Sequence, residues 1–331
     1  MYFITNYAIT QTKRWSPTRN TPERSITLHP RDREPGASVF FCRRDGDGDY
    51  KEIGSKAFFQ LMKGPADEEI LLYIHGFNNT PEGDVFPRAE ALQRLCDSGL
   101  GGHNKSITVI SLMWPCDDDL GIIKDYWDDQ DSSDQSAFGF ARVLGKFMDW
   151  RQRNTGDDAC YRPINILAHS MGNRVLRLTL SRWVTYQGRL PALFRNVFMV
   201  AADIVNESLE RGKSGYPITQ SSRNVVVYYA NDDLAMTASK VANVRNKVAS
   251  RRLGHTGPED MDQVSANVFA IDCDEVNNVY DSPKGHSYFL GAAGTAGAPG
   301  AVFDHILQTL ITGRPRVVGE SRRLVIGDGT A

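Results

Sequence analysis

The sequence predicts an α/β protein with a mainly parallel central sheet and helices on both of its faces. Strand-like and helix-like segments alternate along most of the 331 residues. Three strand-like segments, Glu69–His75, Ser106–Trp114 and Pro163–His169, are nearly continuous apolar runs, as expected of strands that are covered on both faces. Because no linker interrupts the alternation, we expect a single domain over residues 1–331.

The predicted elements follow one another in a regular order. The strands are runs of branched, aromatic and other apolar residues, and the helices carry apolar residues three or four positions apart. The predicted strands are Tyr2–Asn6, Ser38–Arg43, Glu69–His75, Ser106–Trp114, Pro163–His169, Phe194–Ala201, Asn224–Ala230 and Asn267–Ile271. The predicted helices are Val85–Leu95, Ser136–Trp150, Asn173–Tyr186 and Ala301–Thr312.

Two stretches lie outside this order. Residues 117–134 hold eight aspartates and one lysine, and we expect residues 115–135 to form a small acidic cap on the domain. Aspartate density alone is weak evidence for a cation site, so we expect no metal there. The C-terminal tail, residues 313–331, carries four arginines and is expected to be solvated.

The composition excludes several classes of protein. Lys and Arg number 38 and Asp and Glu number 40, so the net charge of −2 offers no basic field for nucleic acid. Five scattered cysteines without a CxxC pair argue against a disulfide framework or a zinc knuckle. The chain shows neither a signal peptide nor an apolar run of about 20 residues. We therefore expect a cytoplasmic protein without a membrane span.

The strongest chemical motif is INILAHSMGNRVL, residues 164–176, in which an apolar strand runs into a helix. The segment Ala168-His169-Ser170-Met171-Gly172 has the nucleophile-elbow pattern, with alanine in place of the first glycine. Small residues are required two positions before and after the serine, because larger side chains would collide with the neighbouring strand and helix. Ser170 is therefore the predicted nucleophile, although a coincidental turn has the same pattern.

A second motif, LLYIHGFNN at residues 71–79, also lies at the end of a buried strand. Gly76 lets the chain turn, so that the backbone N–H of Phe77 faces the serine. We expect the amides of Phe77 and Met171 to form an oxyanion hole, in which each donor contributes about 3 kcal/mol to the transition state. His75 is interpreted as a structural histidine.

A serine nucleophile needs a histidine base, and three histidines follow Ser170. In α/β hydrolases the triad runs in the order serine, acid, histidine. His286 lies in a loop between the last predicted strand and the final helix, where that fold places its base. His255 precedes the last strand and ranks second, and His305 falls within the final helix. His286 is therefore the predicted base.

The acid that orients the histidine has three candidates. Asp232 and Asp233 end the predicted strand Asn224–Ala230, and Asp203 ends the strand before it. One member of the adjacent pair is expected to point inward and the other to solvent, since neighbouring residues of an extended chain face opposite ways. Asp203 is also suited to holding loops together near the site. We rank Asp233 first, then Asp203, then Asp232.

A combination of motifs resembles one family of proteins. The segments are YFITN, YIHGFNN, SLMWP, AHSMGNRVL, NDDLAM, RRLGHTGP and GHSYF. Together they resemble the uncharacterised bacterial α/β hydrolases grouped as a domain of unknown function within the esterase/lipase superfamily, from about Met1 to Thr312. The resemblance implies the α/β-hydrolase fold and a hydrolase activity. It also implies that Asp233, in an Asp-x-Ala-Leu-like segment, is the acid and that His286 is the base.

The sequence thus predicts a serine hydrolase of the carboxylesterase or lipase type. Ser170, His286 and Asp233 would cleave an ester of a small molecule through an acyl-enzyme, without a cofactor or metal. Trp114, Tyr126 and Trp127 are candidates for the substrate pocket, although aromatic residues are more often core. A thioesterase, an amidase or peptidase, or an acyltransferase would use the same triad. A non-catalytic binding protein of the same fold is the remaining alternative.

Overall fold

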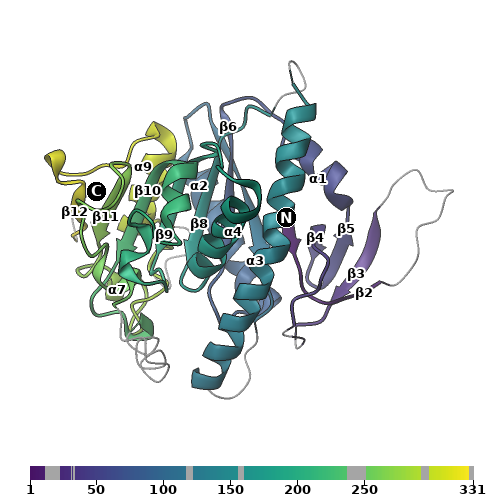
Figure 1. The fold of residues 1–331 in the computed structure, drawn as a ribbon, viewed down its shortest axis with the longest axis horizontal. Coiled ribbons are helices and arrows are strands. Elements are labelled where there is room, and N and C mark those ends of the chain that lie inside the picture. The colour runs from purple at the N-terminus through teal and green to yellow at the C-terminus, as the bar shows by residue number, and fades with distance from the viewer. Residues whose placement is uncertain are drawn as a thin grey trace.

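The structure is a computed structural model that describes residues 1–11, 23–30, 32, 34–116, 122–155, 160–236, 251–291 and 298–327. Within these residues twelve strands form one sheet, in the order β12-β11-β10-β9-β8-β6-β7-β1-β4-β5-β3-β2 (Figure 1). The strands are β1 (Tyr2–Thr5), β2 (Ile9–Gln11), β3 (Arg24–Leu28), β4 (Phe40–Gly46), β5 (Asp49–Glu52), β6 (Glu68–Ile74), β7 (Ser106–Met113), β8 (Ile164–His169), β9 (Phe194–Val200), β10 (Ser222–Tyr229), β11 (Val268–Asp272) and β12 (Arg323–Val325).

Helices connect most of the strands. The α-helices are α1 (Gly54–Leu61), α2 (Phe86–Gly99), α3 (Ile122–Arg153), α4 (Gly172–Gln187), α5 (Tyr216–Ser221), α7 (Leu253–Thr256), α8 (Asn277–Tyr280) and α9 (Ala301–Thr312). The eight neighbouring strands from β12 to β1 pair in parallel, whereas β4, β5, β3 and β2 extend the sheet with antiparallel pairs. The predicted α/β fold with a mainly parallel sheet is confirmed.

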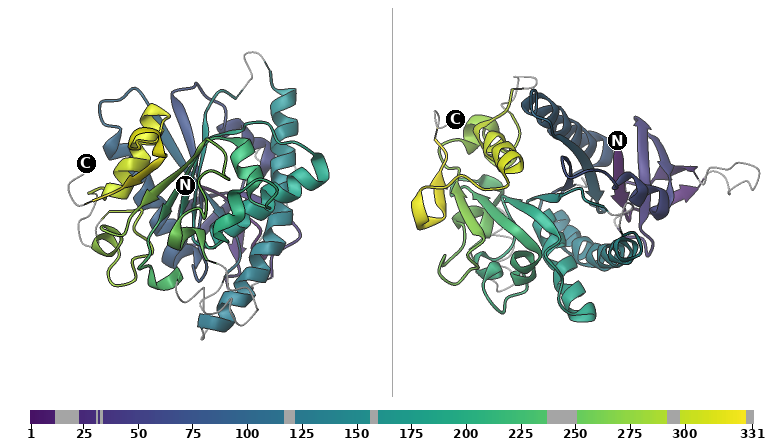
Figure 2. Two further views of the ribbon diagram at one scale, coloured as in Figure 1. Left: turned by 60° about the vertical axis from the view of Figure 1, so that its left-hand side comes forward. Right: turned by 90° about the horizontal axis from the view of Figure 1, so that it is seen from above.

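Two hydrophobic cores lie on the two faces of this sheet. One core joins the sheet to α1, α3 and α4, and the other joins it to α2 and α9. Figure 2 shows the two helical layers seen along the strands, with the N-terminal antiparallel strands beside them. Because both faces of the central strands are covered, their sequences are continuously apolar, as the sequence analysis assumed.

The helix predicted over Ser136–Trp150 is longer than expected and begins at Ile122. Its N-terminal half turns Tyr126, Asp129, Ser133 and Ser136 inward, and all four side chains are buried. This stripe has helical spacing but is mostly polar, so a search for apolar periodicity does not find it. Residues 122–135 of the predicted cap therefore belong to α3, and residues 117–121 lie outside the described part of the chain.

Four short strands, β2, β3, β5 and β12, were not expected from the sequence. Each has three to five residues, and each contains charged or polar side chains. The link between β4 and β5 passes through Asp45-Gly46-Asp47-Gly48, where Gly48 has a φ of 70°. Such short edge strands depend on pairing with the sheet rather than on their own apolar content.

A polar ladder crosses the sheet near the amino ends of the parallel strands. The side chain of Asn224 donates to Asn196, that of Asn196 to Asn165 and that of Asn165 to Glu69, at 2.7 to 2.8 Å. Arg195 pairs with the buried carboxylate of Glu69. Since each amide meets a partner on the neighbouring strand, the ladder fixes the register of β6, β8, β9 and β10.

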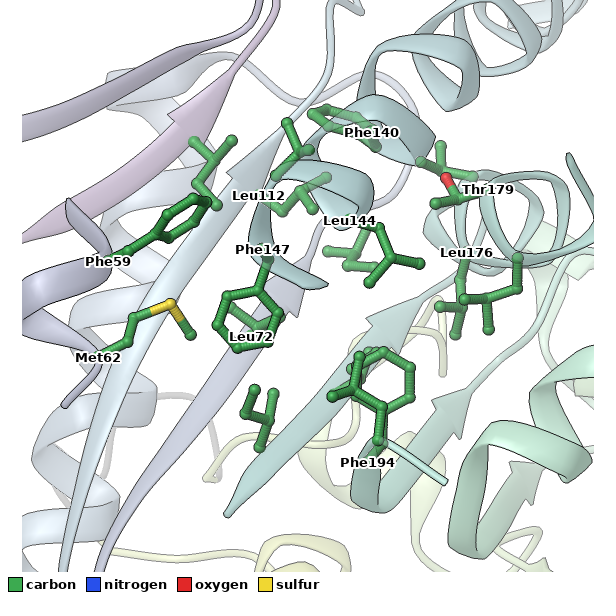
Figure 3. A pocket seen from close by; sticks show the side chains of 18 residues that line it. Phe59, Met62, Leu72, Leu112, Phe140, Leu144, Phe147, Leu176, Thr179 and Phe194 are labelled. Carbon is green, nitrogen blue, oxygen red and sulfur yellow. The ribbon is translucent and has the colours of Figure 1, made fainter. Parts of the chain in front are cut away.

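An apolar cavity of about 90 Å³ lies between the sheet and the helices α1, α3 and α4 (Figure 3). Phe59, Leu144, Leu176 and Phe194 are among its walls, and neither Trp114 nor Tyr126 lines it. The lining includes Ile74 and Leu112, near the carboxyl ends of β6 and β7, and Val175 in the first turn of α4, together with Ile164 and Phe194 at the amino ends of β8 and β9. The walls of the cavity therefore include residues close in the chain to Gly76 and Ser170.

Thr179 provides a test of this cavity, because its buried hydroxyl has no hydrogen-bond partner among the described residues. Thr179→Val replaces that hydroxyl with a methyl group of similar size. We expect it to raise the free energy of unfolding by about 1 kcal/mol, measured by urea denaturation. Thr179→Ser keeps the hydroxyl and removes the methyl group, so it should lower the free energy of unfolding. A valine variant less stable than wild type would contradict the prediction.

Candidate active site

Ser170 lies at the sharp turn between β8 and α4. Its φ is 52°, one of four positive values at non-glycine residues of the described chain. The turn is held by backbone bonds, in which the Ser170 N–H donates to Val200 at 3.0 Å and the Ser170 carbonyl accepts from Asp203 at 3.2 Å. A residue kept in this strained region by its surroundings is a common sign of a functional position.

The sequence around Ser170 suits this turn because it lacks bulk. A Cβ on Gly172 would lie 2.5 Å from the carbonyl oxygen of Ile74, well inside van der Waals contact. A Cβ on Gly76 would lie 3.0 Å from the Cβ of Ser170. The strand exit after β6 and the turn after β8 therefore pack backbone to backbone, as the small residues in both motifs predicted.

The structure brings His286 and Asp233 together. His286 Nδ1 donates to Asp233 Oδ2 at 2.7 Å, and Asp233 is fully buried. The other carboxylate oxygen of Asp233 accepts from the backbone N–H groups of Ala235 and Met236, at 2.9 and 3.0 Å. Asp233 is thus held on both oxygens, and the bond to Nδ1 leaves Nε2 of His286 as the nitrogen that can take a proton.

The loop that carries His286 is braced against the Ser170 turn. Asp281 accepts from the backbone N–H groups of His286 and Ser287, at 2.8 and 2.7 Å. His169, the residue before Ser170, lies 3.2 Å from the His286 carbonyl oxygen through its Nε2, and the two rings are 4.7 Å apart. Burial, and then the like charge of His286, hold the pKa of His169 well below its usual range, so His169 is neutral.

The hydroxyl of Ser170 is buried and forms no hydrogen bond with a described residue. A hydrogen bond between Ser170 and His286 is therefore not among those that the structure contains. What it contains is the pair of His286 and Asp233, with the His286 loop in contact with His169, the residue before Ser170. Catalytic hydrogen bonds are often long without substrate and tighten when it binds.

The other candidates for acid and base have different surroundings. Asp203 accepts from the Tyr126 hydroxyl at 2.8 Å and lies 3.2 Å from Nε of Arg252, so it ties loops together as the sequence analysis considered. Asp232 is exposed and bonds to the side chains of Asn277 and Asn278. Neither is paired with a histidine in these contacts.

The two alternative histidines also lie in other settings. His255 is half-buried within the short helix α7. His305 is buried in α9, where its ring nitrogens meet the hydroxyl of Tyr228 at 2.8 Å and the carbonyl of Arg316 at 2.9 Å. His305 therefore lies within the final helix, on its buried face.

The predicted oxyanion donors are the amides of Met171, which follows Ser170 directly, and of Phe77, which follows Gly76. The backbone N–H groups of Phe77 and Met171 donate to no described residue, so both remain available. The next residue, Asn78, has a φ of 53°, and its N–H donates to the buried carboxylate of Asp129 at 3.0 Å. The ring of Phe77 packs edge-on against Tyr126. Helix α3 therefore holds the Phe77 loop in place.

His75, two residues before Phe77, packs against Trp114 beneath this loop. Its ring stacks on Trp114 at 5.2 Å, and its Nε2 accepts from the Trp114 backbone N–H at 3.1 Å. The Trp114 indole N–H in turn donates to the His75 carbonyl oxygen at 2.9 Å. Chiefly through burial, the pKa of His75 falls to about 4. The Trp114 side chain thus supports the Phe77 loop.

Three supporting residues were missed by the sequence reasoning. His169, Asp281 and Asp129 each hold a loop of the site, through the contacts given above. The signals available were the histidine within AHSMG, an aspartate four residues before GHSYF, and the acidic run. None of these distinguishes a bracing residue from a solvated one.

Helix α3 contacts several of the loops that surround Ser170. Besides its contacts with Phe77, Asn78 and Asp203, Ser132 donates to the carbonyl of Pro115. Asp134 receives two hydrogen bonds from Arg174, at 2.6 and 2.9 Å, in the first turn of α4. The acidic region therefore acts in this structure as a connector. The side chain of Trp127 lies outside the described part.

No group of three or more His, Cys, Asp and Glu side chains among the described residues has the arrangement of a metal site. All five cysteine thiols are free. No helix of the described chain is both long and apolar enough to cross a membrane.

Comparison with protein families identifies the fold family. The family described as "Alpha/beta hydrolase of unknown function (DUF900)" matches residues 52–297. The chain belongs to this family. In this α/β hydrolase the match spans β6, β8 and the segments that carry Ser170, Asp233 and His286. No curated protein and no solved structure matches the chain.

Gly172 tests whether the close contact at the turn is essential. Gly172→Ala places a Cβ against the backbone of β6 and should lower the free energy of unfolding by several kcal/mol, roughly the cost of overpacking a core. Gly145→Ala, within α3, meets only a ring carbon of Trp183 at 3.4 Å and should be neutral or stabilising. Equal effects of the two variants in urea denaturation would contradict the expectation.

The buried histidines predict a loss of stability in mild acid. The unfolded chain protonates His75 near pH 6.5, whereas the folded protein does so only near pH 4. Because the unfolded state binds more protons in this interval, stability falls as the pH drops, by about 2 kcal/mol from pH 7 to pH 5 for this group alone. Urea denaturation of His75→Gln should show a flatter pH dependence. A pH dependence of stability equal to that of wild type would contradict the lowered pKa of His75.

Proposed function

We propose that this α/β hydrolase is a serine hydrolase that cleaves carboxylic esters through an acyl-enzyme. The observation that carries the proposal is the 2.7 Å bond between Asp233 and His286, whose own loop contacts His169 beside Ser170. The strained φ of Ser170 and its free hydroxyl support the role of nucleophile. Nucleophile, base and acid also follow the chain order of the fold.

In this mechanism Ser170 Oγ attacks the ester carbonyl while His286 Nε2 takes its proton. The negative oxygen of the tetrahedral intermediate accepts from the Phe77 and Met171 amides. His286 then returns the proton to the leaving alcohol, and water releases the acid by the same steps. Asp233 keeps the imidazole in the correct tautomer and stabilises its cation. These steps need no cofactor or metal.

We also propose that the first half of α3, which holds Tyr126, forms one wall of the substrate entrance. Support comes from Tyr126, which touches both the Phe77 ring and Asp203. The same triad would also serve a thioesterase, an amidase or an acyltransferase, so the leaving group and acceptor decide between these activities. A series of chromogenic esters from acetyl to lauroyl, with matching thioesters and amides, separates them by relative kcat/KM.

Ser170→Ala tests the nucleophile. We expect it to abolish ester hydrolysis and labelling by a fluorophosphonate while leaving the fold intact, because loss of a serine nucleophile costs about a millionfold in turnover. His286→Ala should be nearly inactive, and His255→Ala only impaired. Circular dichroism controls for folding. A folded Ser170→Ala protein with a tenth of wild-type activity would show that the nucleophile lies elsewhere.

The three aspartates form a matched series for the acid. Asp233→Asn should lose about 10⁴ in turnover, because the amide favours the wrong tautomer of His286. Asp232→Asn should be mild, since Asp232 bonds to asparagines at the surface. Asp203→Asn should mainly lower the melting temperature. A severe loss of turnover in Asp203→Asn, with Asp233→Asn near wild type, would move the acid to the preceding strand.

A further inference from the structure

Three arginines lie beside the Ser170 turn and have no part in the proposed triad. Arg174 and Arg177 stand one and two turns into α4, and Arg252 precedes α7 in the segment RRLGHTGP. We call them the arginine cluster. Asp203 pairs with Arg252, and its charge also acts on Arg174 and Arg177. The backbone N–H of Asp203 donates to the Ser170 carbonyl oxygen at 3.2 Å. The cluster therefore adjoins the predicted nucleophile.

The backbone that carries Arg252 is held tightly against the end of β9. The N–H groups of Leu253 and Gly254 donate to the carbonyls of Ile204 and Ala202, at 2.8 and 2.9 Å. A Cβ on Gly254 would lie 2.1 Å from the backbone nitrogen of Ala202, so only glycine fits there. Arg252 is thus mounted on a rigid segment rather than on a flexible surface loop.

The guanidinium of Arg252 is nearly buried and poorly satisfied. Its side chain is 5% exposed, and its one ion pair joins Nε to Asp203 Oδ1 at 3.2 Å. The buried Nε makes no hydrogen bond of good geometry, and no other described residue accepts from the guanidinium. Asp203 also accepts from Tyr126. A buried cation with unused donors is costly unless an anionic partner completes it.

Arg177 has unused donors as well. One terminal nitrogen donates to Ser214 at 2.5 Å, but its buried Nε has no hydrogen-bond partner among the described residues. Burial, and then the like charges of Arg174 and others, lower the pKa of Arg177 to about 10. Arg174 differs, since Asp134 binds it through both carboxylate oxygens. Two of the three guanidiniums therefore lack the partners that a planar donor fork requires.

The balance of charge within the cluster points the same way. Three guanidiniums face two carboxylates, those of Asp134 and Asp203, among the described residues that contact them. Asp134 is bound by Arg174, and Asp203 accepts from the hydroxyl of Tyr126 in addition to pairing with Arg252. The unused donors of Arg177 and Arg252 match a planar or tetrahedral group of anionic oxygens.

We propose that Arg252 and Arg177 bind an anionic oxygen group, a carboxylate or a phosphate, carried by the substrate near its reacting carbonyl. The inference rests on the proposed function for the identity of the substrate, but the anion site can be tested without it. The expected substrates are therefore esters that carry a negative charge, rather than the neutral fatty esters that an apolar pocket would bind.

Direct binding is measured on Ser170→Ala protein by isothermal titration with inorganic phosphate and with succinate. Both should bind in the millimolar range or tighter, and the tighter one identifies the preferred group. Arg252→Gln should weaken binding about tenfold or more, because a charged donor is lost. Arg252→Lys should recover part of it. Arg223→Gln, an equal charge change on the exposed start of β10, is the matched control and should have no effect.

The same variants are then compared, with Ser170 restored, on 4-nitrophenyl butyrate and on the 4-nitrophenyl monoester of succinic acid. The loss of kcat/KM in Arg252→Gln should be at least about tenfold greater for the acidic ester than for the neutral one. Should Arg252→Gln not fold, Arg177→Gln serves in both assays.

The outcomes separate the two proposals. Absence of phosphate and succinate binding, or equal losses for the two esters, overturns the anion site. Hydrolysis of neither ester, with binding that still depends on Arg252, overturns the esterase and leaves the anion site standing.

Discussion

The contact between the Ser170 turn and the end of β6 is the constraint on which the rest of the site depends. With Gly172 seated on the carbonyls of Ile74 and His75, α4 begins close against the neighbouring strand. The Ser170 backbone adopts a positive φ at this turn, and Gly76, one residue before Phe77, leaves no room for a side chain against Ser170. The backbone geometry of the candidate site thus depends on the absence of side chains at two positions rather than on attractive contacts.

Support for the site comes from a different source. Polar side chains on α3 reach the loops around Ser170, and the loop of His286 is tied back by Asp281 and His169. Buried polar groups of this kind are satisfied one by one, so each removes some freedom from a loop. The site is therefore pre-organised by hydrogen bonds that are made before any substrate arrives.

The sequence predicts the central strands and the Ser170 turn well, because both leave a local pattern. Apolar runs mark strands covered on two faces, and small residues around a serine mark a tight turn. The pairing of His286 with Asp233 follows from chain order and from the family resemblance. In contrast, the sequence does not predict the burial of Asp129 or the first half of α3. A buried stripe of polar residues has the same sequence pattern as a solvated helix face, and only the partners of its side chains distinguish the two.

The arginine cluster was hidden for a similar reason. RRLGHTGP is recognisable as a motif, but the burial of Arg252 depends on Gly254 packing against Ala202, 52 positions earlier in the chain. Likewise, β2, β3, β5 and β12 form only because the sheet offers them an edge. Features that arise from pairing between distant segments cannot be read from a single window of residues.

The polar ladder has a consequence for how the substrate specificity of such a protein can change. Register is secured at the amino ends of β6, β8, β9 and β10, whereas the loops around Ser170 leave from the opposite ends. The contacts that fix the strand register and the residues of the candidate site thus lie at opposite ends of the parallel strands. Insertions, deletions and loop exchange at the carboxyl ends of the strands can therefore change which substrate binds without disturbing the folding of the sheet. This makes the fold a suitable scaffold for new specificities.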